Sequence, residues 1–229
     1  MIPNGRLAVI TGAGRGLGRS LVDEFSEAGW AVVALTRSPT ASTDRANVTV
    51  ATHDVRNEPS TALMSAVDGR PVDLIINNAA QGAPHAWLGE IAAEGVMNAV
   101  DVNVAGPLRL VQALLPQLLA APDPVIINVT SRLGSLTAQA RGDYSDLSTS
   151  YAYKISKSAQ NMLTISLAQD LAGRVRCWAV HPGKMATGMG QADASKDPRQ
   201  AARELRELVD SPDRTSPRFV SLGAADLSW

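Results

Sequence analysis

Short, continuous apolar runs alternate with amphipathic segments along the chain. The runs occupy residues 7–11, 31–36, 48–53, 72–76, 124–130, 174–180 and 218–222. Continuous rather than alternating apolar positions are typical of strands that are buried on both faces of a parallel sheet. The pattern therefore predicts an α/β fold: a doubly wound, seven-stranded parallel sheet with helices on both faces, built as one domain over residues 1–229.

Apolar residues recur at helical spacing between most of these runs. Leu21, Val22 and Phe25 follow the first run in this way. The same spacing predicts helices beginning near residue 59, from about 88 to 119 with a break at 101–103, over 150–171 and over 198–209. The polar segments 38–47 and 135–149 lack such periodicity, so we expect them to be loops.

Length, charge and cysteine content narrow the class of protein. A chain of 229 residues can form one α/β domain with a full core, and its formal net charge of −1 gives no reason to expect nucleic acid as a partner. The single cysteine, Cys177, excludes an intrachain disulfide and a cysteine-based zinc cluster, and we expect no metal site. No apolar run reaches membrane-spanning length and no signal peptide is recognised, so we expect a cytoplasmic protein without membrane contact.

The turn after the first strand is rich in glycine and has the spacing T-G-x-x-x-G-x-G with one extra glycine. Its members are Thr11, Gly12, Gly14, Gly16 and Gly18. Glycine permits a sharp turn and lets an anion approach the free N–H groups and positive dipole end of the following helix. The turn therefore indicates a diphosphate-binding site, although a tight strand-to-helix connection has a similar composition.

A tyrosine and a lysine lie one helical turn apart in the segment 150–171. Lys157 follows Tyr153 by four positions, which places both side chains on one face of the helix. A phenol normally titrates near pH 10, too high for efficient proton transfer at neutral pH, and a nearby ammonium lowers that pKa. The pair is a candidate acid–base unit, although a tyrosine and a lysine also meet on helices by chance.

The chain resembles the short-chain dehydrogenase/reductase family, because several weak signals occur together in the order that this family has. They are the glycine turn, Asp54-Val55, Asn77-Asn78-Ala79, Asn103, Ser131, Tyr153-x-x-x-Lys157 and Pro182-Gly183. Within the family, residues 150–159 and 226–229 are most similar to C-factor and sniffer-type carbonyl reductases. The resemblance implies a Rossmann fold and an NADP(H)-dependent oxidoreductase that interconverts a small-molecule ketone or aldehyde and an alcohol.

The resemblance also implies roles for four catalytic residues. Tyr153 would protonate the substrate carbonyl oxygen, and Ser131 would hydrogen-bond the same oxygen. Lys157 would lower the pKa of Tyr153 and bind the nicotinamide ribose. Asn103 would hold a water that links Lys157 to solvent.

A second set of residues is implied to bind NADP(H). They are Thr11, Gly12, Gly14, Arg15, Gly16, Leu17, Gly18, Arg37, Asp54, Val55, Asn77, Asn78, Ala79, Tyr153, Lys157, Pro182, Gly183, Met185 and Thr187. The choice of NADP over NAD follows from the end of the second strand, where Thr36 and Arg37 replace the usual acidic residue. Arg37 offers a planar fork of donors to a 2′-phosphate, and Arg15 can approach the same phosphate from the other side.

The sequence departs from the family pattern in two places. Ala80 replaces the glycine of the usual Asn-Asn-Ala-Gly, and Ser131 and Tyr153 are 22 positions apart, more than is usual. The additional segment 135–149 is expected to form a loop beside the cleft. We expect a relatively open substrate pocket, lined by Gln81, His85, Trp87, Leu133, Met185 and Met189.

Two other functions remain open from the sequence. C-factor relatives are associated with signalling, so the alternative is a nucleotide-binding regulatory protein with little turnover. The complete set of Ser131, Tyr153 and Lys157 argues against it, because such a protein does not need all three residues. Epimerases and dehydratases on the same scaffold usually carry a longer substrate domain. The family's usual dimer faces correspond to residues 103–119 and 150–171, so we expect a homodimer or homotetramer.

Overall fold

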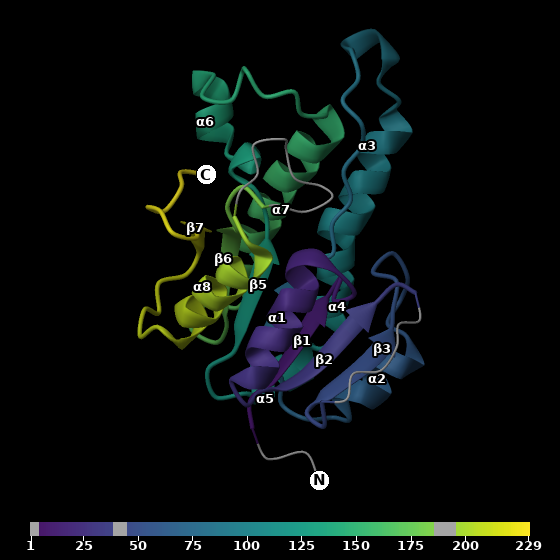
Figure 1. Cartoon of the computed structure of the whole chain (residues 1–229), viewed down its shortest axis with the longest axis vertical. Helices are drawn as coiled ribbons and strands as arrows, with labels where there is room; N and C mark the ends of the chain where they lie inside the picture. Colours follow the sequence, from purple (N-terminus) through teal and green to yellow (C-terminus); the bar gives the residue numbers. More distant parts are fainter. Residues whose placement is uncertain (1–4, 39–44, 186–195) are drawn as a thin grey trace.

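A parallel sheet forms the centre of the structure (Figure 1). The computed structural model describes residues 5–38, 45–185 and 196–229. In this part of the chain the strands are β1 (Leu7–Thr11), β2 (Ala31–Thr36), β3 (Val48–Thr52), β4 (Leu74–Asn77), β5 (Val125–Val129), β6 (Arg176–His181) and β7 (Arg218–Ser221). Their order is β3-β2-β1-β4-β5-β6-β7, and every neighbouring pair is parallel. The predicted seven-stranded, doubly wound sheet is confirmed.

Helices cover both faces of this sheet, as predicted. They are α1 (Gly16–Glu27), α2 (Thr61–Val67), α3 (Ala93–Val100), α4 (Gly106–Ala113), α5 (Leu115–Ala120), α6 (Leu136–Arg141), α7 (Tyr151–Asp170) and α8 (Pro198–Asp210). One core lies between the sheet and α1 with α8, and the other between the sheet and α2, α4, α5 and α7. Successive strand residues alternate between the two cores: Ile10 belongs to the first and Val9 to the second. Both faces are therefore apolar, which explains the continuous apolar runs.

The predicted helix over residues 88–119 is divided in the structure. A short 3₁₀ turn, η1 (Leu88–Glu90), precedes α3, and a π-helical turn, η2 (Asp101–Ala105), separates α3 from α4 at the expected break. A second division separates α4 from α5, because Pro116 lies in the first turn of α5 and has no N–H to continue the ladder. Irregular turns of the π type are frequent at functional sites, and η2 carries Asn103.

The loop predicted for residues 135–149 was wrong over Leu136–Arg141, which form α6. Ser135 is the N-cap, and its hydroxyl accepts a hydrogen bond from the N–H of Ala138 at 3.1 Å. Gly142 ends the helix in the left-handed region, at φ +78°. The side chain of Leu136 is 66% exposed, so this short helix buries no apolar stripe that periodicity could reveal.

The carboxyl ends of all seven strands lie at one edge of the sheet because every pair is parallel. That edge faces the top of Figure 1, where α6 and α3 extend beyond the sheet. Ligands of doubly wound folds bind beyond this edge. The loops that follow β1, β2, β4, β5 and β6 therefore bring the predicted chemistry to one place.

Candidate active site

The glycine turn connects β1 to α1 and leaves the start of the helix open. Gly12 has a φ of +64° and Gly16 of +54°, in the left-handed region that favours glycine. A Cβ on Gly18 would lie 2.1 Å from the main-chain oxygen of Gly12, so no side chain fits there. Arg15, the N-cap residue, makes no side-chain hydrogen bond to the first turn, in contrast to the capping residues of α2, α7 and α8. The chain thus presents free N–H groups that fit a diphosphate.

Thr11, Asn78 and Ala79 connect the ends of β1 and β4. The Thr11 hydroxyl accepts hydrogen bonds from the N–H groups of Asn78 (3.0 Å) and Ala79 (2.9 Å). The side-chain amide of Asn78 donates to the main-chain oxygen of Thr11 at 3.0 Å. These three residues therefore fix the floor of the predicted cofactor site, and the side chains of Thr11 and Asn78 are engaged with the protein itself.

Three predicted cofactor residues have buried side chains. Leu17 packs in the core beneath α1, and Val55 is buried against Gly106, where a Cβ would lie 2.9 Å from that of Val55. Asn77 donates to the side-chain oxygen of Asn128 at 2.8 Å, while its own buried Oδ1 has no partner in the described structure. Leu17 and Val55 have apolar side chains, so only their main-chain atoms can hydrogen-bond a cofactor.

Asn103 joins the loop after β4 to the catalytic helix. Its Oδ1 accepts from the N–H of Gln81, and its Nδ2 donates to the oxygen of Gln81, both at 2.8 Å. The same Nδ2 donates to the hydroxyl of Ser156 at 2.9 Å. Asn103 is fully buried, and its place in the π turn η2 aims it at Ser156, the residue before Lys157.

The structure brings Ser131, Tyr153 and Lys157 together beyond β5. Ser131 follows this strand and caps the 3₁₀ turn η3 (Arg132–Gly134), accepting from the N–H of Leu133 at 3.2 Å. Tyr153 and Lys157 lie on α7, with the lysine nitrogen 5.8 Å from the centre of the phenol ring. Gly134 permits α7 to approach η3, since a Cβ there would lie 2.7 Å from the main chain of Lys157. This close approach sets the distance between the serine and the helix.

Burial shifts the pKa values of both Tyr153 and Lys157. It raises the pKa of the Tyr153 phenol, and a hydrogen bond with Ser131 acts in the opposite direction. Burial also lowers the pKa of Lys157 to about 7. The family resemblance implies that Lys157 lowers the tyrosine pKa. In this structure burial outweighs the Ser131 hydrogen bond in setting that pKa, and the role of the lysine stays a prediction.

The end of β2 and the loop after β3 form a charged cluster. Thr36 is buried and Arg37 exposed. Asp54 was predicted to touch the cofactor. Its Oδ2 accepts hydrogen bonds from two nitrogens of Arg56, from Nη2 at 2.6 Å and from Nε at 3.2 Å. The pKa of Asp54 falls to about 2, chiefly because of the hydrogen bonds from Arg56 and with a smaller contribution from Arg37. The carboxylate is thus neutralised by its neighbours. Arg56 carried no motif that would have identified it.

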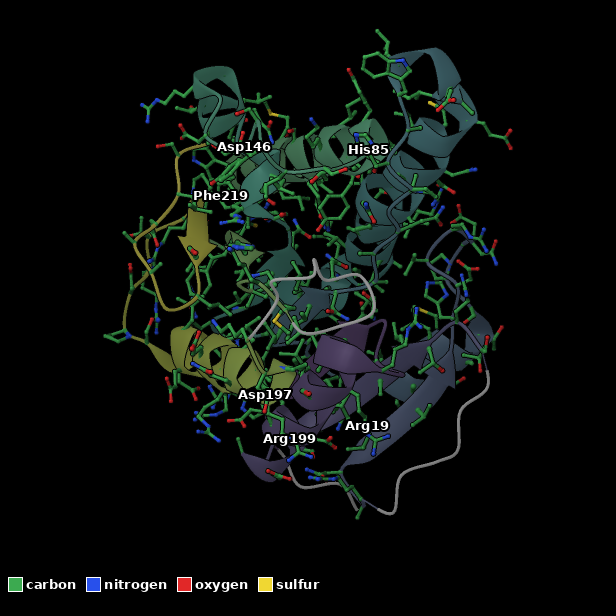
Figure 2. All side chains as sticks on the ribbon, turned by 45° about the horizontal axis from the view of Figure 1, so that its top comes forward. Arg19, His85, Asp146, Asp197, Arg199 and Phe219 are labelled. Carbon is green, nitrogen blue, oxygen red and sulfur yellow. The ribbon has the colours of Figure 1, made fainter. Side chains whose placement is uncertain are left out.

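The predicted substrate residues are only partly brought together. Leu133 and Met185 are buried near the carboxyl edge, and Gln81 is held by Asn103. His85 lies on the exposed segment before α3 (Figure 2), and the Trp87 side chain is 76% exposed. Two further predicted residues, Thr187 and Met189, lie outside the described residues. Pro182 and Gly183 follow β6, and Gly183 has a φ of +97° beneath the side chain of Lys196.

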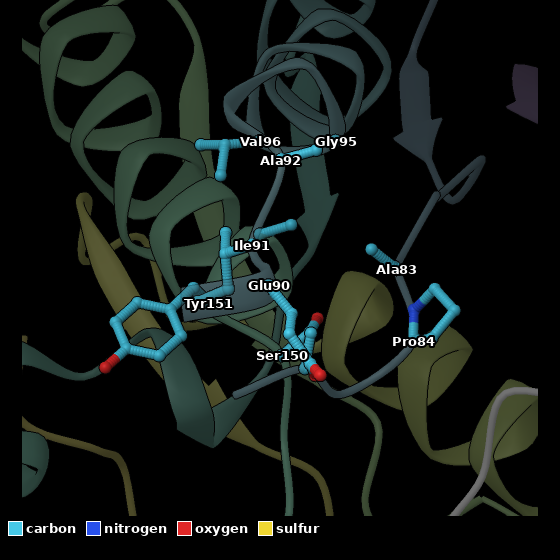
Figure 3. A pocket seen from close by; sticks show the side chains of 11 residues that line it. Ala83, Pro84, Glu90, Ile91, Ala92, Gly95, Val96, Ser150 and Tyr151 are labelled. Carbon is cyan, nitrogen blue, oxygen red and sulfur yellow. The ribbon is translucent and has the colours of Figure 1, made fainter. Parts of the chain in front are cut away.

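A cavity of about 270 Å³ lies beside the start of α7 (Figure 3). Most of its wall is apolar, with the Glu90 carboxylate, Ser150 and Tyr151 as the polar exceptions. The Tyr151 hydroxyl points away from the other labelled side chains in Figure 3. None of the predicted substrate residues that the structure describes lines this cavity, although the segment 83–92 on its wall begins two residues after Gln81.

The additional segment after Ser131 is held by residues 228–229. The Ser135 hydroxyl donates to the oxygen of Ser228 at 2.7 Å. Thr137 donates to the oxygen of Trp229 from its N–H (3.0 Å) and its hydroxyl (2.6 Å). The Trp229 ring stacks on Phe219 of β7, with ring centres 5.3 Å apart. Contacts between distant segments thus fix the start of α6 beside the site, which local sequence patterns cannot reveal.

His53, His181 and Cys177 are buried within the protein. Burial lowers the pKa of His53 and of His181, the latter to about 4, and raises that of the Cys177 thiol to about 12. Over residues 5–38, 45–185 and 196–229, no group of three or more His, Cys, Asp or Glu side chains could hold a metal ion. The helices in the same ranges include none with the length and apolar character needed to cross a membrane.

Comparisons with known proteins identify the family of this chain. The family model for short chain dehydrogenases matches residues 6–198. The C-signal protein of Myxococcus xanthus is 34% identical over 163 residues, which cover 69% of this chain and 93% of that protein. The L-xylulose reductase of Bos taurus is 36% identical over 209 residues, covering 89% of this chain and 81% of that protein. The structure of an NADPH-bound carbonyl reductase from chicken fatty liver has a TM-score of 0.83 at 23% identity, covering 98% and 99% of the two chains.

The parallel sheet, the open glycine turn and the tyrosine–lysine pair are features of a nicotinamide-dependent oxidoreductase. The chain belongs to the short-chain dehydrogenase/reductase family, and it is similar to C-signal, a relative of the C-factor type. The resemblance stated from the motifs is thereby confirmed.

Proposed function

We propose that this protein is an NADP(H)-dependent reductase of a small aldehyde or ketone, or a dehydrogenase of the corresponding alcohol in the reverse direction. One observation carries the proposal: Ser131, Tyr153 and Lys157 come together at the same carboxyl edge of the sheet as an uncapped glycine turn. A protein that only binds a nucleotide has no need of this set. Relatives named as L-xylulose reductase and carbonyl reductase support the same class of reaction.

The chain's own residues would handle the proton and the orientation of the substrate. NADPH, when bound, supplies the hydride that adds to the carbonyl carbon. Tyr153 donates its phenol proton to the carbonyl oxygen, which becomes the alcohol hydroxyl. Ser131 hydrogen-bonds that oxygen and holds it near the phenol, and the Lys157 ammonium stabilises the phenolate that remains. In the reverse direction the phenolate accepts the alcohol proton.

The charged cluster at the end of β2 favours NADP(H) over NAD(H). Arg37 is exposed and free of any ion pair among the described residues, and Arg15 is exposed within the glycine turn. Asp54 is the nearby carboxylate, and Arg56 neutralises it. A 2′-phosphate would therefore meet two arginines and little repulsion.

A second candidate, a regulatory protein with little turnover, is favoured by the similarity to C-signal. Measuring NADPH consumption with a panel of small aldehydes, ketones and ketoses separates the two. The reductase proposal predicts saturable turnover with at least one member of the panel. NADPH binding in the absence of turnover on every class of carbonyl would favour the regulatory candidate instead.

We further propose a homodimer or homotetramer formed through the predicted faces, which correspond to α4 with α5 and to α7. Exposed apolar side chains lie on these helices, namely Leu108, Leu119, Ile155 and Met162. Light scattering of the wild type and of Met162→Glu tests this: the proposal predicts an oligomer that the charged variant weakens. A monomeric wild type would contradict it.

A further inference from the structure

A buried glutamine, Gln160, contacts the catalytic lysine directly. It lies three positions after Lys157 on α7 and is fully buried. The Lys157 nitrogen donates to the side-chain Oε1 of Gln160 at 2.8 Å and to the main-chain oxygen of Val129 at 2.8 Å. Two of the three ammonium donors are therefore fixed by the protein, and one of the two acceptors is a side chain.

The Nε2 end of the Gln160 amide makes no hydrogen bond that would explain a polar side chain at this position of the described structure. Its Nε2 is buried and has no hydrogen-bond partner among the described residues. Leaving a buried amide donor unpaired is unfavourable, so packing alone would select an apolar side chain at this position. The orientation is set by the lysine, because an ammonium can only donate and so requires the amide oxygen. The contact with Lys157 is what the polar side chain provides.

Other charges do not take the place of this contact. Tyr153, on the same helix, is the titratable side chain that lies against Lys157, and burial lowers the pKa of the lysine to about 7. The elements packed against α7 carry several ionisable side chains, but none of them offsets that lowering: Glu94, Asp101, Arg132, Arg176, Cys177 and His181. The neutral Oε1 is the side-chain acceptor that favours the ammonium form.

We propose that Gln160 is a positioning residue that keeps Lys157 protonated and in place through the Oε1–Nζ hydrogen bond. It thereby sets the pH above which the site loses its lysine charge. The use of that charge in binding NADP(H) rests on the proposed function, whereas the coupling between the two side chains does not.

The titration of Lys157 in the protein without cofactor tests the coupling. The chain has four lysines, so NMR of protein labelled at lysine Cε resolves them, and Lys157→Met assigns the signal. Gln160→Met keeps the length of the side chain and removes the acceptor, and Lys157 should then titrate about one pH unit lower, a tenfold loss of proton affinity. Gln160→Glu adds a charge at the same place, and Lys157 should titrate higher than in the wild type.

Thr164→Val is the matched control. Thr164 lies one turn further along α7, where its hydroxyl donates to the main-chain oxygen of Gln160 at 2.9 Å and accepts from Asn128 at 2.8 Å. The variant leaves the Asn128 amide unpaired, so it should lower the thermal midpoint and leave the titration of Lys157 unchanged. Gln160→Met removes a buried unpaired donor, so at a pH well above the lysine pKa, where Lys157 is neutral, it should not lower the thermal midpoint.

Two results would overturn the proposal. One is a Lys157 titration in Gln160→Met that coincides with the wild type. The other is an equal displacement in Thr164→Val, since a general disturbance of the core would then explain both. As a second readout, NADPH binding to Gln160→Met should begin to weaken about one pH unit lower than in the wild type. A wild type that does not bind NADPH would contradict the proposed function, and the lysine titration would still decide the role of Gln160.

Discussion

Cofactor preference depends on Arg37 in this account. The side chain follows β2, is exposed, and contributes to the positive field on Asp54, whose charge Arg56 already neutralises. Arg37→Ala removes a donor that a 2′-phosphate would use, while the ribose hydroxyls of NADH lose no charged partner. The variant should therefore change the affinity for one nucleotide and leave the other nearly constant.

The expected magnitude follows from the exposure of the arginine. A hydrogen bond to a charged group contributes about 1.5–3 kcal/mol, and solvent and salt reduce that value at an exposed site. A loss of about 1.4 kcal/mol corresponds to a tenfold change in Kd. We expect the Kd for NADPH to rise about tenfold and that for NADH to change less than about twofold.

Fluorescence titration of both nucleotides at fixed ionic strength measures these constants. Arg174→Ala is the matched control, because Arg174 is an exposed arginine in the turn before β6, at the opposite edge of the sheet. It should bind both nucleotides like the wild type. A wild type that prefers NADH, or an Arg37→Ala variant that weakens both nucleotides equally, would refute the reasoning.

Further predictions concern Lys157 and Gly18. Lys157→Met should lower kcat, measured by steady-state kinetics, and raise the Kd for NADPH, measured by fluorescence titration. An unchanged Kd would exclude a role of Lys157 in binding NADPH. Burial lowers the pKa of Lys157 to about 7, so the unfolded chain binds more protons between that value and its ordinary pKa. The free energy of unfolding, measured in urea, should therefore rise from pH 7 to 9 by about 2 kcal/mol more in the wild type than in Lys157→Met. Equal pH dependence of the two proteins would show that the pKa of Lys157 is not lowered in the folded state. Gly18→Ala should lower the stability of the protein by about 1–3 kcal/mol, because the added Cβ would meet the Gly12 oxygen. Gly89→Ala is the control and should cause no such loss, because a Cβ at Gly89 would have no neighbouring atom within 4 Å. Equal thermal midpoints for the two variants would contradict the packing of the turn.

The sheet could be predicted because its strands are buried on both faces. Ala31–Thr36, for example, is apolar except at its last residue, and the structure has a strand with those bounds. The edge strand β3 is less buried than β2, yet its apolar run was sufficient. Helix α6 could not be predicted, because its leucine faces solvent and contacts with residues 228–229 hold it.

The site could be predicted in outline but not in its hydrogen bonds. Local motifs identified Tyr153 and Lys157, and the fold brings Ser131 to them. The pairing of Asp54 with Arg56 and the contact of Gln160 with Lys157 depend on side-chain geometry that no motif encodes. A polar residue on the lysine face of a buried helix is the one signal that could have indicated Gln160.

Single-turnover loss of NADPH absorbance in Tyr153→Phe, with the best carbonyl substrate of the panel, tests directly whether Tyr153 is the proton donor. The variant removes the phenol proton and keeps the buried ring that packs near Lys157. General acid catalysis contributes about a hundred- to ten-thousand-fold, so hydride transfer should slow by that factor while the Kd for NADPH stays within about twofold of the wild type. Hydride transfer at nearly the wild-type rate would contradict the account.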